Sequence, residues 1–410
     1  MDIREERGKA IAATGVVKKS SKGDIWTVPA QSRAGFYRVD LAGENPVCDC
    51  PDFELRGKAC KHVFAVAYAV VQQKNSDGST TITETVTVTA EKRKTYPQNW
   101  PAYNRAQTTE QDKFQALLHD LCAGIPEPPA KFGRPPLPLK DMIFSSTFKI
   151  YSTFSGRRFM SDLREANERG YIWKTPHYNS VFRYLEDESL TPILRELVTH
   201  SSLPLKAIET DFAADSSGFT TSKFIRWFDV KYGKPRAEHE WVKFHLMCGV
   251  RTNVVTAIEI GKQFSGDSPF FPSLMETTAA NFKISEVSAD KSYDGVKCVN
   301  AVVKTGGTPF IALKTSATGG VGGAYRQMFH YFQFKRDEFL QRYHKRSNVE
   351  STFSMIKRKF GDALRSKSDV AMVNEALCKV LCHNIVVLIH EIHELGVDPV
   401  FWMDSSVGSC

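Results

Sequence analysis

The sequence predicts an α/β protein in which a mixed sheet with flanking helices follows a helical region and a small zinc-binding domain. From residue 205 onward, apolar segments of strand length alternate with longer helical segments, which is typical of a mixed sheet with helices packed against it. Residues 96–204 carry amphipathic segments of helical length. Residues 48–62, CDCPDFELRGKACKH, have three cysteines and a histidine at the spacing of a zinc site.

Changes of composition along the chain predict four parts. These are a zinc-binding unit at 1–73, a linker at 74–95, a helical region at 96–204 and the sheet domain at 205–410. The linker is rich in threonine and polar residues, although its stretch TITETVTVT, residues 81–89, alternates well enough to form an exposed strand. The helical region either binds DNA or serves as a spacer or dimerisation unit, and no recognition helix can be singled out.

The composition is that of a globular protein with a basic surface. The 410 residues are 42% hydrophobic and 24% charged, with a formal net charge of +8. This length allows several domains with a large core. The positive charge favours a polyanionic partner such as nucleic acid without establishing one.

The cysteine pattern and the apolar segments favour a cytoplasmic protein. Three of the nine cysteines cluster and the other six show no pairing pattern, which excludes a secreted disulfide framework. The charged start MDIREERGKA does not resemble a signal peptide. The most apolar late stretch, residues 376–392, is too short and polar to cross a membrane.

Strands and helices can be assigned in order from periodicity. In the N-terminal unit, DIWTV and GFYRVDL alternate as strands, and HVFAVAYAVV has the length of a short helix. In the helical region the amphipathic segments are 158–170, 179–189 and 190–200, with Gly170 and Pro204 as stops. In the sheet domain the expected strands are 207–215, 242–250, 254–260, 285–290 and 309–314, and long helices follow from Tyr325.

Three carboxylates occupy positions from which they can meet. Asp215 ends the first strand of the sheet domain, Asp290 ends the fourth, and Glu350 lies on a later helix. Ends of neighbouring strands are where open α/β sheets build their sites. A carboxylate cluster is costly unless metal ions neutralise it, and hard oxygen ligands suit Mg²⁺ or Mn²⁺. Two such ions about 4 Å apart can activate the attacking oxygen and stabilise the leaving oxygen of a phosphodiester.

Each acid also has a structural alternative. Asp211 lies on the same strand face as Asp215, and Asp294 is a rival to Asp290, which is itself a candidate helix N-cap. Glu350, taken alone, would more often pair with Arg346 one turn earlier. Three further polar residues are within reach of the site, although structural roles are more frequent for such residues: Lys291, Lys314 and His245.

The segment YHKRSNVESTFSMIK, residues 343–357, predicts a helix that binds a phosphate backbone. At 100° per residue, Tyr343, Arg346, Glu350 and Lys357 fall within about 60° of one another on one face. Arg346 and Lys357 are suited to phosphates, and Tyr343 to a hydroxyl contact or a ring against a base. Three later residues extend the basic track: Lys359, Arg365 and Lys367.

These residues resemble the Y-R-E-K signature of DDE transposases of bacterial insertion sequences, at all four positions and all three gaps. ADSSGF around Asp215 and SADKSY around Asp290 are similar to the first and second acidic motifs of that family. The resemblance covers about residues 205–393. It implies a ribonuclease-H-like fold, with Asp215, Asp290 and Glu350 binding two Mg²⁺ or Mn²⁺ ions.

The same resemblance implies a reaction and its partners. The enzyme would cut the ends of its element and join the freed 3′-hydroxyls to target DNA, with Tyr343, Arg346 and Lys357 contacting DNA near the cut. Two ends must be cut together, so a homodimer on DNA is expected. Two alternatives remain open: a metal-dependent DNA nuclease without strand transfer, and a transposon-derived DNA-binding protein that lacks catalysis.

The cysteine cluster predicts one structural Zn²⁺ ion. Cys48, Cys50, Cys60 and His62 form the pattern C-x-C-x9-C-x-H, and three thiolates with one imidazole are the ligands of a closed tetrahedral site. Residues 25–71 resemble the SWIM zinc finger, in this pattern and in the strand pair that precedes it. Such fingers bind DNA or proteins, and the residues do not decide between the two.

Overall fold

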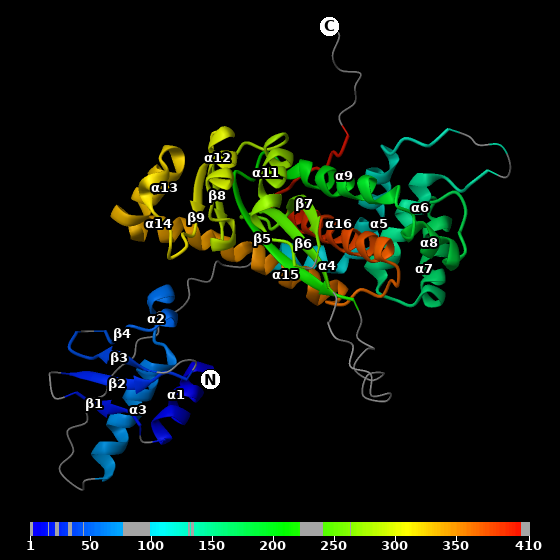
Figure 1. Cartoon of the computed structure of the whole chain (residues 1–410). Helices are drawn as coiled ribbons and strands as arrows, with labels where there is room; N and C mark the ends of the chain where they lie inside the picture. The colour runs from blue at the N-terminus through cyan, green and yellow to red at the C-terminus, as the bar shows by residue number, and fades with distance from the viewer. Residues whose placement is uncertain are drawn as a thin grey trace, which may run out of the picture. The chain divides into compact units, whose positions relative to one another are not determined.

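The chain forms two compact units, Met1–Pro97 and Gln98–Cys410 (Figure 1). This computed structural model describes residues 3–76, apart from 15, 21–23, 32–34 and 44, and residues 99–402, apart from 130–131, 133–134, 222–240 and 263. Residues 74–76 complete a helix. The rest of the expected linker, with the alternating stretch 81–89, lies outside the described residues.

The N-terminal unit is a four-stranded antiparallel sheet covered by helices. Its strands pair in chain order: β1 (Lys18–Lys19), β2 (Ile25–Pro29), β3 (Phe36–Asp40) and β4 (Val47–Cys48). Its helices are α1 (Ile3–Ala13), α2 (Pro51–Arg56) and α3 (Lys61–Ser76). Alternation decides which side chains are buried: Trp26 and Val28 on β2, and Tyr37 and Val39 on β3, point into the core.

Helix α1 is an element that sequence periodicity did not predict. Only three of its residues are buried, Gly8, Ile11 and Ala12, so its apolar stripe is too narrow to stand out among charged residues. It packs against α3 at Gly8. A Cβ there would lie 2.5 Å from that of Phe64 and 3.0 Å from the carbonyl oxygen of Lys61, so only glycine allows this approach.

In the C-terminal unit, helices precede and follow a five-stranded sheet. The strands are β5 (Asp211–Thr220), β6 (Trp241–Gly249), β7 (Val255–Gly261), β8 (Glu286–Ala289) and β9 (Thr308–Ile311). The earlier helices are α4 (Trp100–Thr108), α5 (Glu110–Ala123), α6 (Leu139–Ser152), α7 (Gly156–Glu168), α8 (Tyr178–Leu185) and α9 (Leu190–Ser202). The later ones are α11 (Phe271–Ala279), α12 (Val296–Lys304), α13 (Gly323–Phe334), α14 (Arg336–Tyr343), α15 (Ser347–Phe360) and α16 (Asp369–Glu394).

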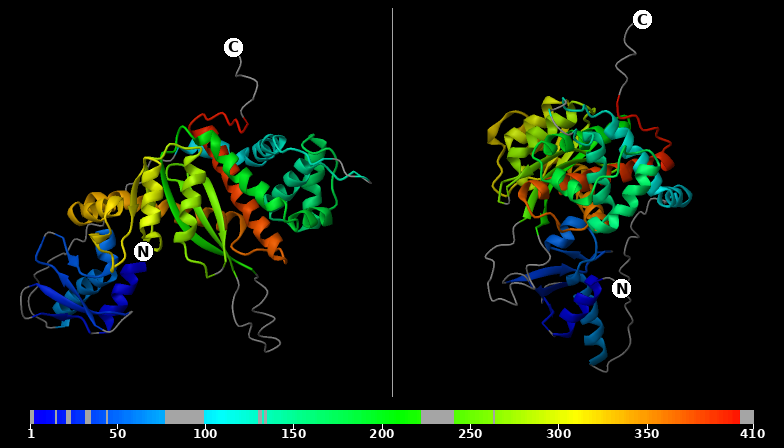
Figure 2. Two further views of the ribbon diagram at one scale, coloured as in Figure 1. Left: turned by 45° about the horizontal axis from the view of Figure 1, so that its top comes forward. Right: turned by 90° about the vertical axis from the view of Figure 1, so that its right-hand side faces the viewer.

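The sheet is mixed, in the order β7-β6-β5-β8-β9. Strands β5, β6 and β7 pair antiparallel, whereas β8 and β9 run parallel to β5. Figure 2 shows the sheet from two further sides with helices packed against it. The predicted α/β fold, a ribonuclease-H-like mixed sheet after a helical region and a small zinc-binding domain, is confirmed.

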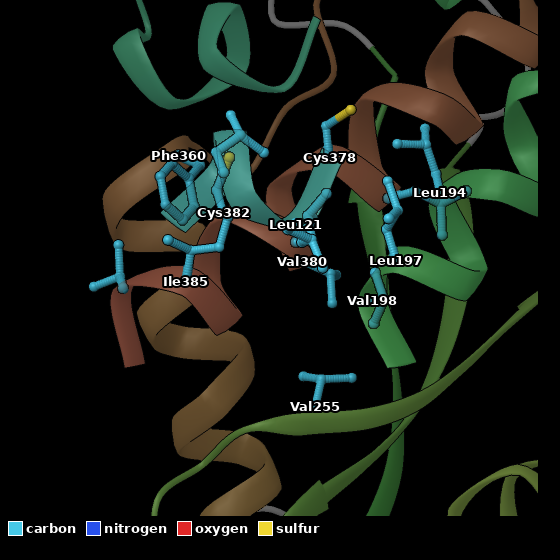
Figure 3. Close-up of a cluster of buried hydrophobic side chains, with 14 of the residues drawn as sticks. Leu121, Leu194, Leu197, Val198, Val255, Phe360, Cys378, Val380, Cys382 and Ile385 are labelled. Carbon is cyan, nitrogen blue, oxygen red and sulfur yellow. The ribbon is translucent and has the colours of Figure 1, made fainter. Parts of the chain in front are cut away.

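Alternate residues of the strands enter two separate cores. Ala213 on β5 packs with the core that contains α5, α6, α9 and α16. Its neighbours Phe212 and Ala214 pack with α11 and α12 on the opposite face. Figure 3 shows the first core, where side chains of α9, α16 and β7 such as Val198, Cys382 and Val255 come together. The helices before the sheet therefore share a hydrophobic core with it.

Helix α16 is apolar because it is the central helix of that core. The helix is longer than the apolar stretch 376–392, and contrary to the expectation from that stretch its length and composition would allow it to cross a membrane. However, 94% of its most apolar 18 residues are buried inside the fold. A helix that is apolar on all sides is expected in the middle of a large domain. Its polar side chains have partners there; the Lys379 ammonium, for example, donates to the carbonyl oxygens of Gly361 (3.0 Å) and Ala363 (2.8 Å).

Asn384 of α16 joins three elements, and replacing it with leucine is expected to destabilise the unit. Its amide accepts from the backbone N–H of Val255 at 2.8 Å and donates to the carbonyl oxygens of Val255 (2.7 Å) and Val198 (3.1 Å). Leucine would leave these buried groups unpaired, at a cost of about 2–4 kcal/mol. Thermal unfolding should shift down by several degrees. The same change at the exposed Asn104 should have almost no effect, and equal melting temperatures for both variants would contradict this account.

Candidate active site and zinc-binding cluster

Asp215 and Asp290 lie side by side on neighbouring parallel strands. The last parallel pair between β5 and β8 is Ala214 with Ala289, so Asp215 is the next residue of β5 and Asp290 is the first residue after β8. Adjacent strands are about 4.8 Å apart. The prediction that Asp215 ends its strand was wrong, because β5 continues to Thr220 in antiparallel pairing with β6. Asp215 instead marks the point where the parallel partner stops.

Asp290 is also the helix N-cap that the sequence allowed. It precedes a short 3-10 helix, Lys291–Tyr293, and its Oδ1 accepts from the backbone N–H of Ser292 at 2.7 Å and from the hydroxyl of the same residue. Both bonds go to one carboxylate oxygen. Capping therefore fixes the orientation of the carboxylate without using its second oxygen.

Arg346 links the third acid to the first. Its Nη1 donates to Oδ2 of Asp215 at 3.2 Å, and its Nη2 lies 2.7 Å from Oε1 of Glu350. The i, i+4 pair of Arg346 with Glu350, which the sequence allowed as a purely structural role, is thus present. Because the same guanidinium also bonds Asp215, Arg346 holds two acids from separate elements close together.

The surroundings of Asp215 raise its pKa to about 6. Burial is the largest cause, and the nearby negative charges of Asp290 and Glu350 add to it, although Arg346 and the backbone N–H of Ser216 act in the opposite direction. Asp290 and Glu350 therefore both act electrostatically on Asp215. The negative charges of these acids are incompletely neutralised, and a divalent cation would neutralise them.

A cavity of about 560 Å³ opens beside Asp215 and Glu350, and Asp290 does not line it. Its lining includes Asp215, Glu350, Lys357 and Arg358. The Lys357 ammonium donates to the hydroxyl of Ser217 at 2.6 Å, which fixes it in the lining. The cavity thus combines acids with cations at one opening, an arrangement suited to metal ions that bind a phosphate.

Tyr343 does not lie on the same helix as Glu350 and Lys357. It ends α14, a 3-10 turn of residues 344–346 follows, and α15 begins at Ser347, so the prediction of one continuous helix was wrong. The residues nevertheless meet. The guanidinium carbon of Arg346 lies 5.9 Å from the centre of the Tyr343 ring, which burial keeps uncharged by raising its pKa.

The rival acids have structural partners elsewhere. Asp211 accepts from the Lys345 ammonium at 2.6 Å, and Lys345 also bonds Glu286 at 2.7 Å, so this network ties the turn before α15 to the sheet. Asp294 accepts from the backbone N–H of Lys314 and from the hydroxyl of Tyr325, both at 2.9 Å.

One acid close to the site carried no sequence signal. Asp267 lies in the loop after β7, its carboxylate 2.5 Å from the Lys243 ammonium. Burial opposes ionisation of Asp267, but the neighbouring Lys243, Ser292 and Ser216 side chains lower its pKa overall. Ser216 directly follows Asp215, and Ser292 lies two residues after Asp290. An isolated loop aspartate without motif or periodicity cannot be singled out from sequence.

His245 packs beside Asp267 without the hydrogen bonds expected of a buried histidine. It stacks on Phe270 at 4.2 Å, and neither ring nitrogen has a hydrogen-bond partner among the described residues. Burial lowers its pKa to about 4, which keeps the ring neutral near pH 7.

In the N-terminal unit, Cys48, Cys50, Cys60 and His62 form one buried cluster. Their ligand atoms all lie within 4.8 Å of one another. The His62 Nδ1 is 3.9 Å from the Cys48 sulfur and 3.7 Å from the Cys60 sulfur. Ligands of a tetrahedral zinc ion are separated by about 3.5–3.8 Å. The four side chains therefore fit a zinc ion nearly as they stand.

Local structure holds these ligands in place. Cys50 is the N-cap of α2, where its sulfur accepts from the backbone N–H of Phe53 at 3.4 Å, and Gly57 ends that helix in a left-handed conformation with φ of 59°. The neighbouring Cys48 thiol is the largest cause that lowers the pKa of Cys60 below its usual value. A thiolate is the form that binds zinc.

Comparisons with known proteins divide along the same two units. Residues 207–385 match the family model described as the transposase DDE domain, and residues 37–71 match that of the SWIM zinc finger. The cryo-EM structure of a piggyBac transposase synaptic complex with hairpin DNA aligns over 72% of this chain and 76% of its own, at 9% identity and a TM-score of 0.34. No curated protein matches. The identification of the two domains of the chain rests on the two family matches.

Proposed function

We propose that this chain, which carries a transposase DDE domain and an N-terminal SWIM zinc finger, is the DNA transposase of an insertion sequence. It cuts the ends of its element and joins the 3′-hydroxyls to target DNA. One observation supports the proposal above others. Asp215 and Asp290 directly follow the last parallel pair of β5 and β8, and Arg346 bonds both Asp215 and Glu350. This geometry supports a single site formed by acids from two neighbouring strand positions and a helix.

In this proposal Asp215, Asp290 and Glu350 hold two Mg²⁺ or Mn²⁺ ions. The donor set fits, because it consists of hard oxygen atoms and the neighbouring acids help to raise the pKa of Asp215 in the absence of a cation. When bound, the metals supply activation of the attacking oxygen and stabilisation of the leaving oxygen. Asp290 contributes the oxygen that its capping bonds leave unused.

The remaining signature residues hold the DNA. Arg346 lies between two acids and can turn one edge of its guanidinium toward a phosphate, and Lys357 presents its charge at the cavity from a bond to Ser217. Tyr343 offers its ring or hydroxyl next to Arg346. The working unit is a homodimer on DNA, because two ends are cut together. It acts in the cytoplasm, at the nucleoid.

Cleavage and joining by the purified protein test this function. The substrate is labelled duplex DNA carrying the terminal repeats that flank the gene, incubated with Mg²⁺ and unlabelled target. The proposal predicts cut ends and joined products. Cleavage without joining would favour the nuclease alternative. Binding without cleavage would favour the non-catalytic DNA-binding protein.

Metal affinity should fall when the pH drops below about 6. A cation needs the ionised carboxylate, so it must displace the proton that Asp215 holds below its raised pKa of about 6. We expect Mn²⁺ affinity, measured by calorimetry, to fall by about tenfold per pH unit below that value. In the metal-free protein, the free energy of unfolding changes with pH in the opposite direction to the metal affinity. Because its folded pKa exceeds that of the unfolded chain, Asp215 adds stability as the pH falls from about 6 toward the unfolded value.

The matched control is Asp211→Asn, which removes an acid from the same strand outside the site. It should keep the pH dependence of Mn²⁺ binding, whereas Asp215→Asn should lose both the affinity and its change with pH. Binding that is equally strong at pH 5 and pH 7 in the native protein would contradict the prediction.

A further inference from the structure

A second cavity, of about 420 Å³, lies in the C-terminal unit away from the three acids. It is formed where α6 ends and α7 begins, against α8 and the segment that connects α15 to α16. None of its lining residues lines the cavity at the acids. Six residues of the lining carry its chemistry: Lys149, Phe154, Phe182, Arg365, Lys367 and Glu375.

Lys149 is a largely buried lysine that lines this cavity. The residue is 6% exposed, yet no described residue forms a hydrogen bond or ion pair with its side-chain nitrogen. Lys379, which is also buried, has two carbonyl acceptors and Glu375 nearby. Burial, followed by the charge of Arg365, lowers the pKa of Lys149 to about 8, although the charge of Glu375 acts in the opposite direction. An unpaired buried cation is costly, and a bound anion would offset that cost.

Arg365 adds a second cation whose position is fixed. Its Nη1 donates to the carbonyl oxygen of Thr153, which ends α6, at 2.5 Å. Glu375 does not pair with either cation, because its carboxylate accepts from the backbone N–H groups of Arg365 (3.0 and 2.9 Å) and Ser366 (2.8 Å). The acid thus shapes the turn, and the cationic side chains remain available to a ligand.

The start of α7 and two aromatic rings complete the cavity. Ser155 and Gly156 line it at the first turn of this 13-residue helix, which has no acidic residue there, so its free N–H groups favour an anion. Phe154 is 49% exposed and Phe182 39% exposed. Gly156 is required for the position of Phe182, because a Cβ would lie 2.7 Å from its ring. Exposed ring faces beside an anion site are suited to a base.

We propose that this cavity holds one nucleotide of the DNA strand that enters the active site. Its phosphate lies between Lys149, Arg365 and the start of α7, and its unpaired base lies against Phe154 and Phe182. The inference rests on the proposed function. Asp362 lines the first cavity and Arg365 the second, and three residues of extended chain span at most about 11 Å. That distance corresponds to the length of about three nucleotides along one DNA strand, so one strand can reach both cavities.

The proposal gives a function to the basic track and to the helical region. Lys357 and Arg358 line the first cavity, and Arg365 and Lys367 line the second, so positive charge continues from one to the other. Helices α6, α7 and α8 then bind DNA through the residues that form the second cavity, in addition to packing against the sheet.

The test compares Lys149→Met with Lys140→Met, a control on the exposed start of the same helix. Binding of terminal-repeat DNA to the full chain is measured without divalent metal, over a range of salt concentrations. For Lys149→Met we expect about tenfold weaker binding and a salt slope smaller by about 0.9, the contribution of one phosphate. Its melting temperature should be unchanged or higher, because an unpaired buried charge has been removed. Native binding and slope in Lys149→Met, with cleavage intact, would overturn the inference while leaving the proposed function in place.

A second arm tests the base and the source of the phosphate. With 2-aminopurine placed at successive positions near the cut, one position should give an emission change on binding that Phe154→Ala abolishes. Absence of such a position would contradict base stacking. Inorganic phosphate and thymidine 5′-monophosphate are titrated in parallel. Tight binding of either that depends on Lys149, with an unchanged DNA slope, would assign the cavity to a free phosphate compound and overturn the DNA proposal.

Discussion

Replacing Glu350 with glutamine is expected to abolish cleavage and joining, with a rate lower by at least about a thousandfold. Glutamine keeps the size of the side chain and an oxygen that can still accept from Arg346, which lies 2.7 Å away in the native protein. It removes the negative charge that a divalent cation needs. Glu350 has a side chain 56% exposed on α15, so the fold should be unaffected.

The control for this variant is Glu338→Gln on the neighbouring helix α14. Glu338 is equally exposed, with 58% of its side chain accessible, and it bonds Tyr331 on the surface. It should retain full activity. DNA binding without metal should be preserved in both variants, which separates loss of chemistry from loss of substrate. Cleavage by Glu350→Gln within about tenfold of the native rate would exclude Glu350 as a metal ligand.

Removing the zinc ion should unfold the N-terminal unit and leave the rest of the chain folded. Structural zinc in such small domains contributes about 10 kcal/mol or more, which exceeds what a core of this size can supply alone. Cys48, Cys50 and Cys60 are among the buried residues of that core, so the metal site is part of it. Cys60→Ser or a strong chelator should expose residues 3–76 to proteolysis and hydrogen exchange, with residues 99–402 unchanged.

Zinc content provides the check on this result. The native protein should contain one zinc ion per chain, and Cys60→Ser should contain none. Cys122→Ser, at a buried cysteine of α5 in the other unit, should keep the zinc and lose only local stability. An N-terminal unit that stays protected after complete zinc removal would contradict the structural role of the metal.

The sequence predicted the order of the elements that carry the three acids, but not where two of those elements begin and end. The segment DFAADSSGFT contains serines and a glycine with little strand preference, so the strand was expected to end at Asp215. Pairing with β6 up to Thr220 outweighs that local preference. The 3-10 turn between Tyr343 and Ser347 likewise contains neither glycine nor proline, so no local signal interrupts the expected helix.

Other features depend on tertiary contacts and have no local pattern. Asp267 lies near the site only because the fold brings its loop close to Ser216 and Ser292. Lys149 acquires significance from its burial without a partner, which residue spacing on α6 does not predict. By contrast, the spacing of the zinc ligands was sufficient to predict the cluster, because all four residues lie within 15 positions of one another.

The most direct test of the account is the location of Mn²⁺ in the protein bound to terminal-repeat DNA. Crystals of that complex, measured at the manganese absorption edge, show metal positions independently of activity. The account predicts two anomalous peaks, each in contact with carboxylate oxygens from the set Asp215, Asp290 and Glu350, and none in Asp215→Asn crystals. Manganese bound elsewhere, or a complex in which Arg346 still occupies the space between Asp215 and Glu350 with no metal present, would contradict it.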